Sequence, residues 1–198
     1  MRFRTWPLVA ATGLGIATVV VLNHVVISDA SGQAAAPAAT SSEVTKAICI
    51  VQPLGDKEKN KLTGKVVFTQ VNDGVEIVAE LTGLTPGEHG FHVHEFGDCS
   101  MADGTCAGGH FNPDGKPHGA PDAAQRHVGD FGNIKADASG KASYKRVDKL
   151  ITFSGPHSII GRSIIVHAAP DDYSQPTGNA GARVGCGVIG IGDPKMTQ

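Results

Sequence analysis

Two groups of histidines have the residue types and spacing of a metal centre. The first is His92-Val93-His94. Alternate residues of a strand point to the same face, so both imidazoles can reach one ion while Val93 faces the core. A His-x-His pair alone is a weak indication of a metal site. His167 follows an apolar run, where a lone histidine is more often a core residue, and it gains weight only from the other histidines.

The second group occupies 21 residues of a stretch rich in glycine and proline, with ligand candidates separated by eight, nine and three positions: His110, His118, His127 and Asp130. Three imidazoles and one carboxylate suit the tetrahedral shell of zinc. Because metal binding can supply folding free energy, an ion could order a loop too polar to fold alone. The alternative is a surface loop that happens to be rich in histidine. The separate His-x-His pair argues against it.

The elements that must position these residues are short strands. From residue 44 onward, apolar residues recur with period two, as in 75–81, which follows 65–71 after the turn Asn72-Asp73-Gly74. We therefore predict eight strands, at 44–52, 65–71, 75–81, 90–96, 132–136, 141–147, 163–168 and 183–189. No later window favours a helix longer than about two turns. The pattern predicts an all-β antiparallel sandwich or barrel with two long loops, 98–130 and 169–182.

The length of 198 residues suits one domain with an appendage. We read residues 1–30 as a signal peptide, because two arginines precede an apolar run and small residues follow it. An uncleaved membrane anchor is the alternative, since the apolar character approaches the roughly 20 residues that span a bilayer. Residues 31–43 read as a flexible linker and 44–198 as the folded domain. Both interpretations predict an exported protein, periplasmic or extracellular, with a possible N-terminal membrane tether.

Net charge is −2 at neutral pH, so the chain as a whole is not a strongly basic nucleic-acid binder, and we expect no nucleic-acid partner.

Five motifs resemble those of the copper/zinc superoxide dismutases, in order and with similar spacing over about residues 44–191. They are Gly90-Phe91-His92-Val93-His94-Glu95-Phe96-Gly97-Asp98, Gly109-His110-Phe111-Asn112-Pro113, Arg126-His127-Val128-Gly129-Asp130, Ile160-Gly161-Arg162 and Gly178-Asn179-Ala180-Gly181-Ala182-Arg183. The resemblance implies an eight-stranded antiparallel Greek-key barrel of the immunoglobulin-like sandwich type. It also implies one copper and one zinc ion per chain.

The resemblance implies which residues hold each ion. The copper ligands would be His92, His94, His110 and His167, and the zinc ligands His110, His118, His127 and Asp130. His110 would then bridge the two ions. Four imidazoles suit the tetragonal geometry of Cu(II), and zinc has no redox chemistry, so copper would carry the electron. A bridging imidazole must lose both ring protons, which two cations favour.

The activity that the resemblance implies is that of an oxidoreductase, superoxide dismutase. Superoxide would be disproportionated to dioxygen and hydrogen peroxide by alternate reduction and oxidation of copper, with His110 handling a proton. Arg183 matches the family's active-site arginine, which is suited to orient a small anion. Asp171 matches the aspartate that hydrogen-bonds one ligand of each ion, and these ligands would here be His92 and His118. A non-enzymatic copper/zinc carrier on the same scaffold is the alternative. The complete set of ligands with Arg183 favours the enzyme.

One departure from the eukaryotic enzymes concerns the charges that steer substrate. Residues 168–182 contain no lysine or arginine, and this segment is shorter than its eukaryotic counterpart. Electrostatic focusing speeds the association of such enzymes with superoxide. We therefore expect the field to come from Arg183, with Lys116 and Arg126 as further candidates.

The chain has four cysteines, and an exported protein can keep a disulfide. The family's single disulfide implies Cys186 as the strand partner, while Cys99 and Cys106 both remain available in the loop. The position of Cys99 after Gly97-Asp98 resembles the bacterial pattern and favours Cys99–Cys186. Two other histidines, His89 and His157, are expected to hydrogen-bond to loops. Family members pair through different surfaces or are monomers, so a homodimer is one possibility.

Overall fold

The computed structural model describes residues 43–196, and nearly all regular structure in this part of the chain is β-strand. The strands are β1 Lys46–Pro53, β2 Thr63–Val71, β3 Gly74–Thr82, β4 Gly87–His94, β5 Asp130–Ala136, β6 Ala142–Asp148, β7 Ser163–His167 and β8 Arg183–Ile191. A single turn of 3-10 helix, η1 at Thr105–Ala107, interrupts the first long loop. All eight predicted strands are therefore confirmed, with boundaries that differ by a few residues.

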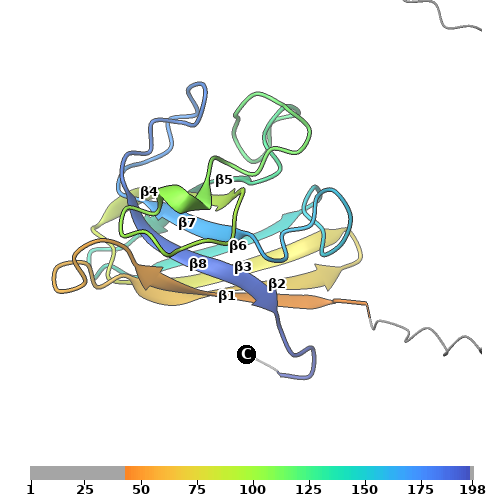
Figure 1. Ribbon diagram of the computed structural model, residues 1–198, viewed down its shortest axis with the longest axis horizontal. Helices are drawn as coiled ribbons and strands as arrows, with labels where there is room; N and C mark the ends of the chain where they lie inside the picture. Colours follow the sequence, from red (N-terminus) through yellow and green to blue (C-terminus); the bar gives the residue numbers. More distant parts are fainter. Residues whose placement is uncertain (1–42, 197–198) are drawn as a thin grey trace, which may run out of the picture. The chain divides into compact units, whose positions relative to one another are not determined.

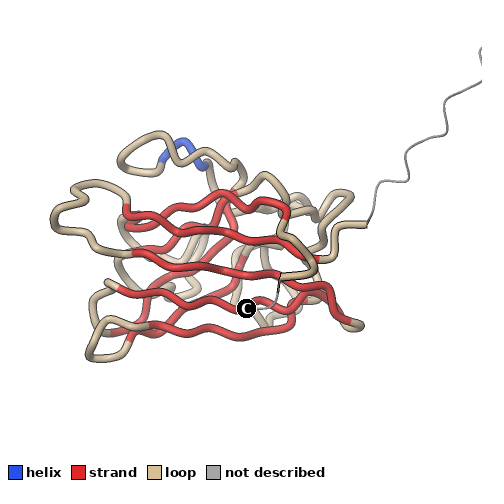
Figure 2. The backbone as a smooth tube through the Cα atoms, turned by 90° about the horizontal axis from the view of Figure 1, so that it is seen from below, coloured by secondary structure: helices blue, strands red, loops and turns tan. Residues whose placement is uncertain are grey.

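The strands close into an antiparallel barrel in the order β1-β2-β3-β6-β5-β4-β7-β8. The pairings of β3 with β6 and of β4 with β7 join strands that are not consecutive, and these crossovers make the connection a Greek key. The predicted all-β barrel is thus confirmed. Figure 2 shows the strands in red, with loops in tan at both ends of the barrel.

Period-two patterning explains why these segments are strands with one face inside. In β3, Val75, Ile77, Ala79 and Leu81 are buried in the core, while alternate positions face outward. The β2–β3 hairpin turns at the predicted site, where Gly74 has φ 146°. A Cβ atom there would lie 2.2 Å from the carbonyl oxygen of Asp148, so only glycine fits.

The site depends on two strands that are buried on both faces, β4 and β7. On β4, Phe91 and Val93 belong to the main core, and His92 and His94, on the opposite face, are also buried. On β7, Ile165 packs outside the barrel in a small cluster with Leu54, Ala107 and Cys186. The two long loops bury the outer faces of these strands. Figure 1 shows them, one green and one blue, on the side of the barrel where β4, β5 and β7 lie.

The predicted signal peptide or anchor at residues 1–30, and most of the predicted linker, lie outside the described residues. Within residues 43–196, no helix has the length and apolar character needed to cross a membrane.

Candidate metal centre

The first histidine group is assembled by neighbouring strands and one loop. His92 and His94 lie on β4, and His167 ends β7, the strand paired with β4. His110 joins them because it forms an isolated β-bridge with His94. One ring nitrogen from each of these four buried residues lies within 4.8 Å of every other. The four predicted copper ligands are therefore together.

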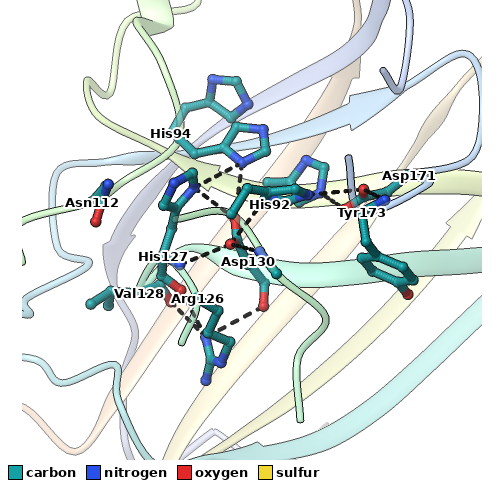
Figure 3. Close-up of polar contacts among 12 residues, drawn as sticks. His92, His94, Asn112, Arg126, His127, Val128, Asp130, Asp171 and Tyr173 are labelled. Carbon is teal, nitrogen blue, oxygen red and sulfur yellow. Dashed lines mark hydrogen bonds and ion pairs between the residues drawn. The ribbon is translucent and has the colours of Figure 1, made fainter. Parts of the chain in front are cut away.

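The second group forms around the carboxylate of Asp130 at the start of β5. In each of the three histidines, Nδ1 is the ring nitrogen that faces this carboxylate. The distance from Nδ1 to a carboxylate oxygen of Asp130 is 2.9 Å for His110, 3.0 Å for His118 and 3.1 Å for His127. Backbone N–H groups of Gly119 and His127 also donate to Asp130 Oδ2. Figure 3 shows this carboxylate beside the ring of His127. His110 is shared by both groups, as the bridging assignment requires.

Unpaired nitrogens in the first group test whether these residues fit a metal ion. Nδ1 of His92, Nε2 of His94 and Nε2 of His167 are buried without a hydrogen-bond partner. The other nitrogen of each ring is bonded, to Asp171, to the Gly108 carbonyl and to the Gly181 carbonyl respectively. Leaving a buried polar atom unpaired costs about 1–3 kcal/mol. Three bare nitrogens converging on one point therefore fit a cation that accepts their lone pairs.

The second group gives the same result. Nδ1 of His118 lies 3.0 Å from Asp130 Oδ2 but forms no hydrogen bond with it. Two atoms that both carry lone pairs repel each other at this distance unless positive charge lies between them. Three imidazole nitrogens and one carboxylate oxygen match the tetrahedral donor set of zinc.

Electrostatics distinguish the two groups. Burial lowers the pKa of His92 to about 3 and that of His167 to about 4, which keeps both rings neutral, the form that binds metal. Burial also acts on His118, but the neighbouring carboxylates of Asp130 and Asp171 outweigh it and raise the pKa of His118 to about 9. The first group is thus a cavity of neutral donors, and the second attracts positive charge.

Asp171 connects the two groups from the loop between β7 and β8. Its Oδ2 accepts a hydrogen bond from Nε2 of His92 at 2.8 Å, and its Oδ1 one from Nε2 of His118 at 2.9 Å. Figure 3 shows the contact with His92. Both predicted contacts are present. Hydrogen bonds from these two histidines hold the pKa of Asp171 well below its usual range, although burial acts in the opposite direction.

Asn133 on β5 fixes the backbone of Asp171. Its Oδ1 accepts the Asp171 N–H at 2.7 Å and its Nδ2 donates to the Asp171 carbonyl at 2.9 Å. Asn133 is not among the site residues predicted from the sequence. The two residues are 38 positions apart, and an asparagine in a strand carries no pattern that predicts such a pairing.

Arg183 begins β8 and is tied to the loop around η1. Its Nη1 donates to the Gly104 carbonyl at 2.6 Å and its Nη2 to the Gly108 carbonyl at 2.7 Å. These glycines flank η1 with positive φ of 69° and 74°, values that other residues rarely adopt. The two carbonyls leave the guanidinium half-buried and fixed in orientation.

The disulfide joins Cys99 to Cys186, with a Cα–Cα distance of 5.8 Å across 87 positions of sequence. This confirms the predicted pairing and excludes Cys106 as the partner. Cys49 is buried and free, and Cys106 is free and half-buried. The bond attaches the loop before His110 to β8, three residues beyond Arg183.

Arg126 is not a steering charge, and that prediction was wrong. Its side chain is only 4% exposed, and Nη2 contacts the buried carboxylate of Asp148 at 2.5 Å. Its Nη1 donates to the carbonyls of His127 at 3.0 Å and Val128 at 3.2 Å. The guanidinium therefore holds the turn that carries two ligand candidates. Lys116 is exposed and remains a candidate.

The two further histidines form the expected hydrogen bonds. The ring of His89 lies 2.8 Å from the carbonyls of both His167 and Thr85. The ring of His157 lies 3.0 Å from the Leu150 carbonyl and from a carboxylate oxygen of Asp114.

Comparisons with known proteins agree with this fold. The sequence model of the family described as "Copper/zinc superoxide dismutase (SODC)" matches residues 62–189. A solved structure, "Crystal Structure Analysis of the clock protein EA4", is 44% identical, with a TM-score of 0.69. The match covers 76% of this chain and 96% of that one. The closed eight-stranded barrel and the two histidine groups define a Greek-key protein whose side chains could hold two metal ions. The chain belongs to the copper/zinc superoxide dismutase family.

Proposed function

We propose that this protein is a superoxide dismutase that uses one copper and one zinc ion. The observation that carries the proposal is the set of bare, buried nitrogens of His92, His94 and His167, which face one point beside His110. Because His110 also belongs to the second group, a single imidazole would connect the copper site to the zinc site. When bound, copper would supply one-electron redox chemistry and zinc a positive charge of fixed oxidation state.

The overall reaction converts two superoxide ions and two protons to one dioxygen and one hydrogen peroxide. His110 suits the role of proton carrier. Its Nδ1 faces Asp130 at 2.9 Å, so Nε2 is the nitrogen left for the first group and for a proton. His110 is 8% exposed, more than any other candidate ligand, so water has access to it. The ring can therefore hold a proton without leaving the second group.

Arg183 provides the positive charge that an anionic substrate requires. The guanidinium is aimed by the Gly104 and Gly108 carbonyls and stays charged at neutral pH. It lies close enough to His94 and His167 to lower the pKa of both rings, after the larger effect of their burial. Superoxide would thus be held by a fixed cation beside the copper group.

The alternative is a non-enzymatic copper/zinc carrier on the same scaffold, and the family resemblance alone does not separate the two. Arg183 favours the enzyme, because storing a cation requires no second cation aimed at the site.

The place where the protein acts is a separate question. We propose export to the periplasm or outside the cell, supported by the disulfide, which such compartments preserve. The membrane tether and the homodimer stay predictions.

The test compares superoxide decay catalysed by the copper- and zinc-loaded wild-type protein with that of His167→Ala. His157→Ala is the matched control, because the ring of His157 also contacts a backbone carbonyl, that of Leu150, but belongs to neither metal group. We expect rapid decay with wild type and His157→Ala and little above background with His167→Ala. Equal rates for wild type and His167→Ala would refute the enzyme.

A further inference from the structure

The carboxamide of Gln175 pairs with the backbone of His118. Its Oε1 accepts the His118 N–H at 3.0 Å and its Nε2 donates to the His118 carbonyl at 2.8 Å. One side chain therefore satisfies both backbone groups of a candidate zinc ligand, as a neighbouring strand would. The two residues are 57 positions apart, so this contact ties the loop between β7 and β8 to the loop after His110.

The same loop encloses His118 on other sides. Asp171 accepts from its Nε2 at 2.9 Å, and the ring of Tyr173 stacks on the imidazole with centroids 6.4 Å apart. Tyr173 has φ 61°, a conformation that a tyrosine adopts only where its surroundings hold it. A Cβ atom at Gly178 would lie 2.8 Å from Nε2 of His118, so the backbone passes directly against the ring.

The loop is fixed at two places by carboxamides. Asn133 holds the backbone of Asp171 to β5, and Gln175 holds the loop to His118. Asp171 aims the imidazole of His118, but only Gln175 bonds to its main chain from this loop. Because 168–182 has no lysine or arginine, the segment supplies no steering cation. Its hydrogen bonds to His92 and His118 instead hold those candidate ligands in place.

We propose that Gln175 is a positioning residue for zinc, which keeps Nδ1 of His118 aimed into the second group and slows release of the ion. The inference rests on the zinc assignment made above. Residues that hydrogen-bond to metal ligands commonly contribute 10- to 100-fold to metal affinity. Gln175 differs from such residues because it bonds to the backbone of the candidate ligand His118 and not to its imidazole. It touches no part of the first group, so the larger effect of its removal is expected on zinc.

The experiment measures zinc transfer from the fully loaded protein to a chromophoric chelator. Gln175→Ala removes both hydrogen bonds, and Gln175→Glu keeps the acceptor but places an oxygen against the His118 carbonyl. The control is Gln70→Ala, because the Gln70 carboxamide also forms two hydrogen bonds to the backbone, in its case by donating to the carbonyls of Val71 and Gly74 in the distant β2–β3 hairpin. We expect zinc release about tenfold faster or more from both Gln175 variants, with copper release unchanged.

A spectrum separates positioning from a general loss of stability. With Co(II) in the zinc site, the visible bands report ligand geometry, so both Gln175 variants should shift them and Gln70→Ala should not. Release rates and bands equal to those of Gln70→Ala would overturn the role of Gln175. A wild-type protein that keeps no zinc at all would instead overturn the zinc assignment itself, and the two failures are thus distinguishable.

Discussion

Arg183 and His94 donate hydrogen bonds to the same acceptor, the carbonyl oxygen of Gly108, from Nη2 at 2.7 Å and from Nδ1 at 3.0 Å. A candidate copper ligand and the cation proposed to hold superoxide therefore share one anchor. The loop that carries this carbonyl is attached to β8 by the Cys99–Cys186 disulfide. A shift of the loop would move the ligand and the substrate-binding charge together.

Substitution of Arg183 should reduce the capture of superoxide. Arg183→Ala removes the aimed cation, and we expect kcat/KM to fall about 10- to 100-fold with a weaker dependence on ionic strength, since electrostatic guidance raises association rates by about 10 to 1,000. Arg183→Lys keeps the charge but not the planar fork that fits two carbonyls, so it should recover part of the rate. Superoxide decay at several salt concentrations checks this. Unchanged salt dependence in Arg183→Ala would contradict the assignment.

The disulfide should stabilise the fold as well as the loop. It closes a chain of 87 residues, and disulfides commonly contribute about 2–5 kcal/mol to the free energy of unfolding. We expect the double substitution Cys99→Ser with Cys186→Ser to lower the stability of the metal-free protein by this amount, measured by urea unfolding. An unfolding midpoint equal to that of wild type would show that the bond constrains little.

Substitution of Arg126 should lower the stability of the protein, whereas substitution of Lys116 should change only the salt dependence of kcat/KM. Arg126→Ala removes the nearest cation from the buried carboxylate of Asp148 and leaves only the more distant Arg146, at 3.7 Å. We therefore expect a loss of stability that approaches the roughly 3–5 kcal/mol of a broken buried ion pair. Lys116→Ala should leave stability unchanged and weaken the salt dependence of kcat/KM, because its charge is exposed. Thermal unfolding measures the stability of each variant, and kcat/KM at several salt concentrations measures its salt dependence. A salt dependence altered by Arg126→Ala in folded protein would restore the steering role that its burial excludes.

The two free thiols should react differently. Burial raises the pKa of Cys49 to about 12, so its thiolate is scarce and shielded. Cys106 is half-buried, with its sulfur beside the Asp98 carbonyl. A thiol reagent should therefore label only Cys106 in the native protein, and both cysteines once the chain is unfolded without reductant. Peptide mapping identifies the labelled residue. Native labelling of Cys99 would show that the disulfide is open.

Local patterns predicted the strands, the His-x-His pair and the histidine-rich loop because these depend on neighbours in sequence. The assignment of His110 and His167 to the copper group required the family resemblance. Period two marks the buried face of β3, and a histidine pair on alternate positions of β4 must share a face. The clamps made by Asn133 and Gln175 depend instead on residues 38 and 57 positions away, which no local pattern records. Arg126 was misjudged for the same reason, since its partner Asp148 lies on another strand. The choice of Cys99 over Cys106 required the family resemblance.

The central claim is that the two-metal centre turns over superoxide rather than storing copper. The most direct measurement mixes the copper- and zinc-loaded protein with a large molar excess of superoxide and follows dioxygen and hydrogen peroxide. The proposed enzyme should consume all of the superoxide, release equal amounts of the two products and remain active for a second addition. A fast phase that ends at an amount equal to the bound copper, followed by decay at the uncatalysed rate, is the behaviour of a carrier and would contradict the claim.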